Sequence, residues 1–478
     1  MRRFASTVPT DDGHPYRTGP WRPQATEFDV TGLKVIGTLP DDLQGVYLRN
    51  TENPLHDSLG RYHPFDGDGM VHALHFHDGR ADYRNRFVRT KAFEAELEAG
   101  EALWAGVMEH PAKSRRPGWG ARVGSKDASS TDVIVHGGRA LTSFYLCGDL
   151  YAMDPVSLEQ FGAEDWVPAD WGVCSHPKVD ERTGEMLFFN YSTEWPYLHF
   201  GVVSPAGALV HYAPVELPGP RMPHDMAFTE RFVILNDLPM FWDPAALRQG
   251  VYANRYHPDL PARFAIVPRR GTEVRWFEAS PTNVLHWINA YEDGDTVVLE
   301  GFHQGNPDPR RPGDDRWKVT ARYLDANELQ TRPYRWTFDL RTGATREEVI
   351  DDACLEFGMI NARHAGRPYR YTYAMTAEPG WFLFNGLTRL DTATGARSQW
   401  TFAPGVFASE SPMAPRPGAT REDDGYVLSF VSDMNADTSE CHVFDAAHVS
   451  AGPVCRVLLP ERLSSGTHAV WAPEASLR

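Results

Sequence analysis

The sequence predicts an all-β protein, and within that class it favours a β-propeller over tandem β-sandwiches. Short strand-like runs, such as GEMLFFNYS at 184–192 and RFVILND at 231–237, alternate with turn signals. Helical periodicity is scarce, and its best candidates are 90–108 and 243–253. A short motif with an Asp three residues before a Thr-Gly pair recurs at 180–185, 339–344 and 391–396, where we expect it to close hairpins between outer strands. Such repetition is typical of blades of about 40–50 residues.

Composition and charge limit the classes of function. The chain has 478 residues, of which 42% are apolar, and we expect residues 1–478 to form a single domain. Its apolar runs are strand-sized and fall short of the roughly 20 residues that span a bilayer. A formal charge of -17 makes nucleic acid an unfavourable partner. The five scattered cysteines indicate buried, reduced thiols, and the polar residues after MRR predict a cytoplasmic location.

The stretch YHPFDGDGMVHALHFHDG at 62–79 is rich in histidine and aspartate, but we interpret it as structural. In a strand, His75 and His77 share one face and His72 lies on the other, so at most two of these three could bind one metal ion. His77 also adjoins the hairpin turn at Asp78-Gly79. We therefore predict a surface β-hairpin with solvated imidazoles rather than a metal site.

Four other histidines are better candidates for a metal site. His176, His224, His286 and His468 each begin or lie within an apolar strand-like run. A lone buried histidine is more often a core residue than a ligand. However, these four are separated by 48, 62 and 182 residues, so a propeller would place each on a different blade. Inner strands of different blades converge on the central axis, which would bring the four imidazoles together.

Four imidazoles would suit iron, copper or zinc better than magnesium or calcium, because nitrogen donors prefer the softer ions. Carboxylates behind the ligands would then accept the outer ring N–H groups and fix the tautomers. Glu356 and Glu410 are acidic residues in apolar surroundings and are candidates for this role.

The ordered motifs resemble those of the carotenoid cleavage oxygenase family over nearly the whole chain. They include HPKVDERTGEM, HDMAFTERFVILND, LEFGMINARHAGRPYRYTY and LPERLSSGTHAVW. The resemblance implies a seven-bladed propeller with a dome of loops and helices over one face. It also implies a non-haem Fe²⁺ held by His176, His224, His286 and His468, with Glu356 and Glu410 behind them. The implied reaction is oxidative cleavage of a conjugated C=C bond by O₂ to two carbonyl products, and no side chain is required as acid, base or nucleophile.

The chain also departs from the family pattern. Family members commonly carry a third glutamate where this chain has Leu146, so we expect one histidine, His224, to lack a carboxylate partner, and Asp149 is a doubtful substitute. Stilbene-cleaving members use a tyrosine and a lysine to hold a phenol. The corresponding places here are Met108 and Tyr145, which favours a carotenoid or apocarotenoid over a stilbenoid or phenylpropanoid. Alternatively, these two residues belong to the core.

Three further hypotheses stay open at this stage. A metal-free propeller that serves as a binding scaffold would need the four histidines to diverge in space. A lactonase-like hydrolase would bind calcium through carboxylates and Asn, which the imidazole-rich set disfavours. Segment 237–256, with Met240, Phe241 and Trp242, is a candidate for peripheral contact with a membrane, and the alternative is that these side chains pack as ordinary core.

Overall fold

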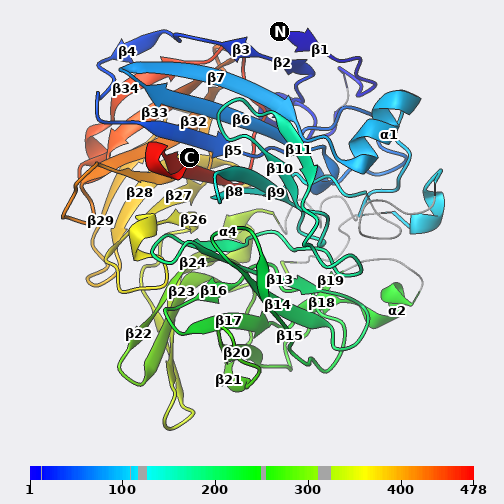
Figure 1. Cartoon of the computed structure of the whole chain (residues 1–478), viewed down its shortest axis with the longest axis vertical. Coiled ribbons are helices and arrows are strands. Elements are labelled where there is room, and N and C mark those ends of the chain that lie inside the picture. Colours follow the sequence, from blue (N-terminus) through cyan, green and yellow to red (C-terminus); the bar gives the residue numbers. More distant parts are fainter. Residues whose placement is uncertain (12, 108, 117–125, 249–253, 310–323, 478) are drawn as a thin grey trace.

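The structure is a computed structural model that describes residues 1–11, 13–107, 109–116, 126–248, 254–309 and 324–477. It consists mainly of antiparallel strands grouped as the blades of a propeller (Figure 1). Four groups are separate four-stranded sheets. Their strands are β8 (Asp132–His136), β9 (Arg139–Ser143), β10 (Tyr151–Met153) and β11 (Gln160–Ala163); β12 (Lys178–Asp180), β13 (Glu185–Tyr191), β14 (Leu198–Val203) and β15 (Leu209–Pro214); β16 (Ala227–Phe228), β17 (Phe232–Asp237), β20 (Ala262–Pro268) and β21 (Arg275–Ala279); and β22 (Val284–Asp293), β23 (Thr296–Gln304), β24 (Thr331–Asp339) and β25 (Thr345–Val349).

The remaining three blades belong to two larger sheets. In a ten-stranded sheet, β30 (Val406–Ala408) joins two blades, and β4 (Val35–Gly37) extends the outer edge of the second. A five-stranded sheet forms the last blade and carries β3 (Asp29–Val30) on its edge. The strands of the three blades are β26 (Leu355–Met359), β27 (Tyr371–Ala377), β28 (Phe384–Asp391) and β29 (Arg397–Thr401); β31 (Met413–Pro415), β32 (Gly425–Asp433), β33 (Thr438–Asp445) and β34 (Pro453–Leu458); and β35 (Ala469–Pro473), β5 (Gly45–Arg49), β6 (Met70–His77) and β7 (Arg80–Phe87).

The innermost strands form the ring around the axis. Strand β8 contacts both β35 and β12, β22 contacts both β16 and β26, and β31 contacts β35. The ring closes where β35, the last strand of the chain, pairs with β5 near its start, so one blade is built from both ends of the sequence. Closure in this way leaves few exposed sheet edges. The all-β propeller prediction is therefore confirmed.

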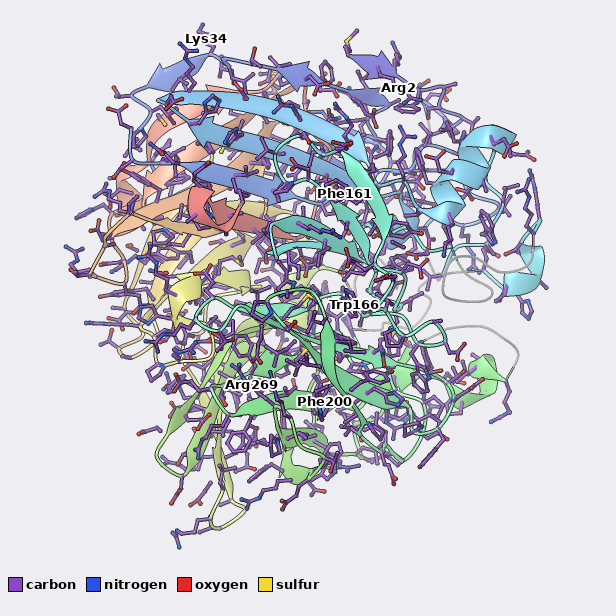
Figure 2. All side chains as sticks on the ribbon, in the orientation of Figure 1. Arg2, Lys34, Phe161, Trp166, Phe200 and Arg269 are labelled. Carbon is purple, nitrogen blue, oxygen red and sulfur yellow. The ribbon has the colours of Figure 1, made fainter. Side chains whose placement is uncertain are left out.

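The hydrophobic core lies between neighbouring blades. Each large cluster combines side chains of two adjacent sheets, as where Tyr47 of β5 packs with Phe430 of β32. Side chains on the middle strands are mostly buried, whereas the outermost strands of the blades are more exposed. Phe200 on β14 is 0% exposed and Phe161 on β11 is 50% exposed (Figure 2). Of the five cysteines, four are buried, one is partly buried and none forms a disulfide, as expected.

The repeated Thr-Gly phrase does close hairpins, because glycine tolerates the left-handed backbone that these turns need. Gly184, Gly343 and Gly395 have φ angles of 70°, 79° and 71°. The last two join the outer strands β24–β25 and β28–β29, as predicted. The first joins β12 to β13, the two inner strands of its blade, so the prediction of an outer position was wrong there.

Helices are few, and two lie on one side of the molecule in Figure 1. The expected helix at 90–108 is α1 (Lys91–Ala99), capped by the Thr90 side chain and ended by Gly100. The expected helix at 243–253 is reduced to α2 (Pro244–Leu247), and 249–253 lie outside the described residues. A third short helix is α4 (Ala326–Leu329). None of the described helices is long and apolar enough to cross a bilayer.

Two small two-stranded sheets stand outside the blades, formed by β1 (Arg2–Arg3) with β2 (Thr26–Glu27) and by β18 (Met240–Trp242) with β19 (Asn254–Tyr256). The second of these sheets contains part of the predicted membrane segment. Phe241 stacks on His257 with ring centroids 4.0 Å apart, and Trp242 packs in a buried cluster between two blades. Phe241 and Trp242 are 6% and 4% exposed. Of the two alternatives for Phe241 and Trp242, the structure therefore supports packing in the core.

Candidate metal centre

The four candidate histidines lie at the same end of the ring of inner strands. His176 comes just before β12, His224 just before β16 and His468 directly before β35. His286 is the third residue of β22. His176 has a φ angle of 65°, an unusual backbone conformation for a residue other than glycine. The chain thus brings together residues far apart in sequence, as the blade spacing predicted.

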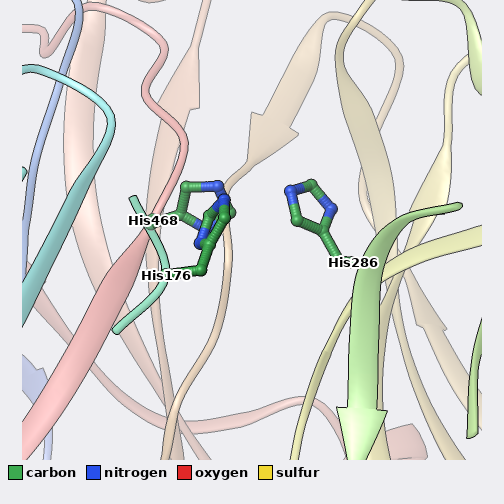
Figure 3. A group of neighbouring side chains, drawn as sticks. All are labelled: His176, His286 and His468. Atoms are coloured by element: carbon green, nitrogen blue, oxygen red, sulfur yellow. The ribbon is translucent and has the colours of Figure 1, made fainter. Parts of the chain in front are cut away.

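The imidazole rings converge within a small volume. The His176 ring centroid lies 4.4 Å from that of His468, 4.9 Å from that of His224 and 5.3 Å from that of His286. The Nε2 atoms of His176 and His224 are 3.3 Å apart. Figure 3 shows His286 approaching on β22 from the side opposite His176 and His468. One nitrogen from each of these three buried residues lies within 4.8 Å of the others.

Carboxylates lie beside the outer nitrogens of three histidines. Glu356 Oε2 is 2.7 Å from His286 Nδ1, and Glu410 Oε1 is 3.3 Å from His468 Nδ1. Both were predicted for this role. Backbone amides fix the carboxylates in turn, because Phe357 N donates to Glu356 at 2.8 Å and Ala469 N donates to Glu410 at 2.6 Å.

The third carboxylate is Asp132, which the sequence interpretation missed. It is the first residue of β8, and its Oδ2 lies 3.2 Å from His176 Nδ1. The available signal was an acidic residue at the head of the apolar run DVIVHGG. Among the described residues, no carboxylate is within ion-pair distance of His224. Leu146 is partly buried beside Phe144 and Tyr145, and Asp149 pairs with Lys91 at 2.9 Å, so neither replaces the missing glutamate at His224.

Burial and neighbouring charges set the protonation of these groups. Burial, followed by the neighbouring imidazoles, holds the pKa of His176 and of His224 well below the usual 6.5, and burial lowers the pKa of His286 to about 3. Burial acts to lower the pKa of His468, but the carboxylates of Glu410, Asp132 and Glu52 outweigh it and raise the pKa to about 9. Burial also raises the pKa of Glu356 to about 8.

The donor set fits a metal ion. His286 Nε2 is buried and has no hydrogen-bond partner in the structure, although its Nδ1 is fixed by Glu356. A buried nitrogen without a partner is costly unless something completes its coordination. Three of the four imidazoles are held neutral, which is the form that binds metals. The histidine cluster is therefore a candidate metal site, and the neighbouring carboxylates are placed to orient its imidazoles.

Aromatic side chains extend from the histidines. The Phe357 ring stacks on His286 at 4.8 Å and lies 5.1 Å from His468. Phe357 also contacts Phe382 at 5.8 Å, and Phe382 contacts Phe65 at 6.4 Å. Tyr145 is 5.5 Å from Phe65, which places it at the far end of this aromatic chain. Met108 lies outside the described residues.

The histidine-rich stretch at 62–79 forms the expected hairpin of β6 and β7, with Asp78 and Gly79 at positive φ in the turn. Its histidines do not approach the metal site. His72 bonds Tyr83 at 2.8 Å and is fully buried, so the prediction of a solvated imidazole was wrong for this residue. The stretch instead contributes Phe65 to the aromatic chain. The alternation of aspartate and glycine in FDGDG did not indicate this role.

A hollow with a volume of about 680 Å³ lies at the ends of the inner strands opposite the histidines. Glu181 follows β12 and Glu230 follows β16, whereas the histidines precede these strands. Arg182, Arg363 and Arg367 also line it. Such a charged lining does not suit an apolar substrate, so the chemistry belongs to the histidine end.

Comparison with known proteins agrees with this geometry. The family model described as retinal pigment epithelial membrane protein (RPE65) matches residues 21–473. The carotenoid 9,10(9',10')-cleavage dioxygenase 1 of Pisum sativum is 31% identical over 500 residues, which cover 97% of this chain and 91% of that protein. The chain belongs to the RPE65/carotenoid cleavage oxygenase family. It is therefore a dioxygenase-type enzyme.

Two solved structures of this carotenoid cleavage oxygenase family show the same fold. The lignostilbene dioxygenase of Pseudomonas brassicacearum superposes with a TM-score of 0.84 at 27% identity, covering 96% of this chain and 99% of that one. A cobalt-substituted apocarotenoid oxygenase of Synechocystis gives a TM-score of 0.84 at 26% identity, covering 95% and 98%. The family resemblance seen in the sequence motifs is confirmed.

Proposed function

We propose that this protein is an Fe²⁺-dependent dioxygenase that cleaves a conjugated C=C bond of a carotenoid or apocarotenoid to two carbonyl products. One oxygen atom of O₂ would enter each product, so the reaction balances without a further reductant. The observation that carries the proposal is His286, whose Nε2 is buried without a partner while Glu356 holds Nδ1 and Phe357 covers the ring.

His176, His224, His286 and His468 would hold the iron through their ring nitrogens. Bound iron supplies the activation of dioxygen beside the alkene. The protein's own contribution is to position these groups and exclude water. Glu356 and Glu410 each accept an outer N–H, which fixes the tautomer that leaves the inner nitrogen free to bind metal. No acid, base or nucleophile is needed from the side chains.

The aromatic chain supports a planar, apolar substrate. Phe357, Phe382 and Phe65 present ring faces and edges next to the histidines, which suits a conjugated polyene. A stilbenoid or phenylpropanoid alkene is the second candidate. It is favoured by the similarity to the lignostilbene dioxygenase structure and by the buried phenol of Tyr145, 7% exposed, at the far end of the chain.

A cytoplasmic enzyme with an apolar substrate would benefit from peripheral contact with a membrane. Because Phe241 and Trp242 are buried, contact through 237–256 would use the partly buried Met240 and Leu247 instead. Binding of the protein to phospholipid vesicles, compared between the wild type and Met240→Ser, tests this part of the proposal. Equal binding of both would refute it.

Substrate cleavage is tested with the iron-loaded enzyme, ¹⁸O₂ and a panel of carotenoids, apocarotenoids and hydroxystilbenes. We expect two aldehydes, each labelled with ¹⁸O, from a carotenoid or apocarotenoid, and no product from His286→Ala. Tyr145→Phe should leave polyene cleavage unchanged. If hydroxystilbenes are cleaved instead and Tyr145→Phe selectively impairs them, the second candidate is correct.

A further inference from the structure

The seven innermost strands contribute to the metal centre in a regular way. At the histidine end of the ring, each strand contributes one buried histidine or carboxylate of the candidate metal centre, placed in its first residues or in the segment that leads into it. Four of these side chains are imidazoles and three are carboxylates. In ring order they are Asp132 (β8), His176 (β12), His224 (β16), His286 (β22), Glu356 (β26), Glu410 (β31) and His468 (β35).

Each carboxylate pairs with a histidine from an adjacent strand of the ring. Glu356 is 2.7 Å from His286, and Glu410 is 3.3 Å from His468. Asp132 Oδ2 lies at ion-pair distance from His176, 3.2 Å from its Nδ1. His224 lies between the strands of two other histidines, which explains why no carboxylate of the described residues reaches it.

The other contacts of Asp132 leave its Oδ2 atom available to His176. The residue is buried, and its Oδ1 accepts the backbone N–H of Val133 at 2.7 Å. The Nδ2 of Asn50 bonds the backbone carbonyl of Asp132 and not its carboxylate. Lys178, the nearby lysine, pairs with Asp225 at 2.7 Å. A buried carboxylate is costly without a partner, and within the part of the chain that the structure describes His176 is the side chain at ion-pair distance from it.

We propose that Asp132 is a positioning residue for the metal ligand His176. Its carboxylate accepts the Nδ1–H of His176 and so directs Nε2 toward the metal. The blade of β8–β11 thereby keeps one carboxylate at the site although it has Leu146 where a glutamate was expected, and the carboxylate serves a different histidine. This inference rests on the proposed function, because it requires His176 to bind metal.

Metal release provides the first test. Wild-type protein and Asp132→Asn are loaded with Fe²⁺ or Co²⁺, and the dissociation rate is measured with a chelator in excess. Loss of a carboxylate behind a histidine ligand typically weakens metal binding by about 10- to 100-fold. We expect Asp132→Asn to release metal about 10-fold faster or more. The matched control is Asp149→Asn, which removes another acid of the same blade and should release metal at the wild-type rate.

A spectroscopic measurement separates positioning from a general structural effect. In the Co²⁺ protein, an Nδ1–H that is bonded to a buried carboxylate should give a paramagnetically shifted NMR signal that exchanges slowly with water. We expect three such signals in the wild type and in Asp149→Asn, and two in Asp132→Asn. Asp132→Glu, which keeps the carboxylate, should retain metal better than Asp132→Asn.

The outcomes distinguish the two levels of the proposal. Wild-type protein that binds neither metal at the four histidines would refute the proposed function and this inference together. Wild-type protein that binds metal but shows only two slowly exchanging signals would refute the role of Asp132 alone, and this result needs no variant to fold. Equal metal release from Asp132→Asn and the wild type would also refute it.

Discussion

The Glu356→Gln substitution tests how far a carboxylate behind a ligand contributes to metal binding. Glu356 is buried, its Oε2 accepts from His286 Nδ1 at 2.7 Å and from Phe357 N at 2.8 Å, and its Oε1 has no hydrogen-bond partner in the structure. Glutamine has nearly the same shape and keeps an acceptor oxygen. The substitution therefore removes the negative charge and leaves the packing in place.

The expected loss is about 10- to 100-fold in metal affinity, as for other residues of this kind, which equals about 1.4–2.7 kcal/mol of binding free energy. The stability of the metal-free protein should change little. Burial raises the pKa of Glu356 to about 8, so at pH 7 the metal-free protein carries mostly the protonated carboxyl, which the amide mimics. A charge effect on metal binding without a folding defect is the specific expectation.

The assay combines calorimetric Fe²⁺ binding under anaerobic conditions with the melting temperature of the metal-free protein. Glu440→Gln is the matched control, because Glu440 bonds His442 Nε2 at 2.9 Å in a histidine–carboxylate pair on β33, away from the metal centre. Glu440→Gln should bind iron like the wild type. Unchanged iron affinity in Glu356→Gln, or an equal loss in Glu440→Gln, would refute the role assigned to Glu356.

Further expectations concern proton release, the aromatic wall and the core. Because the pKa of His468 is raised to about 9, the metal-free site carries a proton there at pH 7 that metal must displace. Apparent affinity should rise between pH 7 and 9, and the proton released from His468 should fall from near one per iron to about one half. Calorimetry in buffers of different ionisation enthalpy would contradict this if no proton were released at pH 7. Phe357→Leu should lower kcat/KM about 2- to 10-fold at unchanged iron content, since aromatic contacts contribute about 0.5–1.5 kcal/mol; a loss of iron would show a structural role. The double substitution Phe241→Ser and Trp242→Ser should lower the free energy of unfolding by several kcal/mol, on the order of 3–5 kcal/mol for each large core side chain. It should also reduce cleavage of membrane-embedded and soluble substrates alike. A loss of cleavage confined to membrane-embedded substrate would contradict the burial of these two residues.

Sequence periodicity indicated the class of fold, and blade spacing together with the family resemblance predicted the convergence of the histidines. Blade-length spacing of His176, His224, His286 and His468 depends only on repeating architecture, which local strand and turn signals reveal. Asp132 was not predictable in the same way, because its role follows from the ring neighbours of β8, a relation that appears only when the blades close. A single acidic residue before a strand has many ordinary explanations.

Burial of individual aromatic residues was also beyond sequence patterns. Phe241 and Trp242 share the apolar character of a membrane-contacting cluster, but tertiary packing on His257 and on the blade interface buries them. His72 looked like part of a solvated hairpin, yet its face of β6 meets the neighbouring blade and its ring bonds Tyr83. Period-two alternation gives the face of a strand and does not indicate which face is covered.

The most direct test of the central claim is the metal content of the purified protein and of its single histidine variants, measured by mass spectrometry after anaerobic loading with Fe²⁺. The account predicts about one iron per chain in the wild type and in the control His75→Ala. It predicts a large loss of iron when His176, His224, His286 or His468 is replaced by Ala, with the melting temperature of the metal-free protein preserved. Full iron content in any one of the four variants, or loss of iron in His75→Ala, would contradict the four-histidine site.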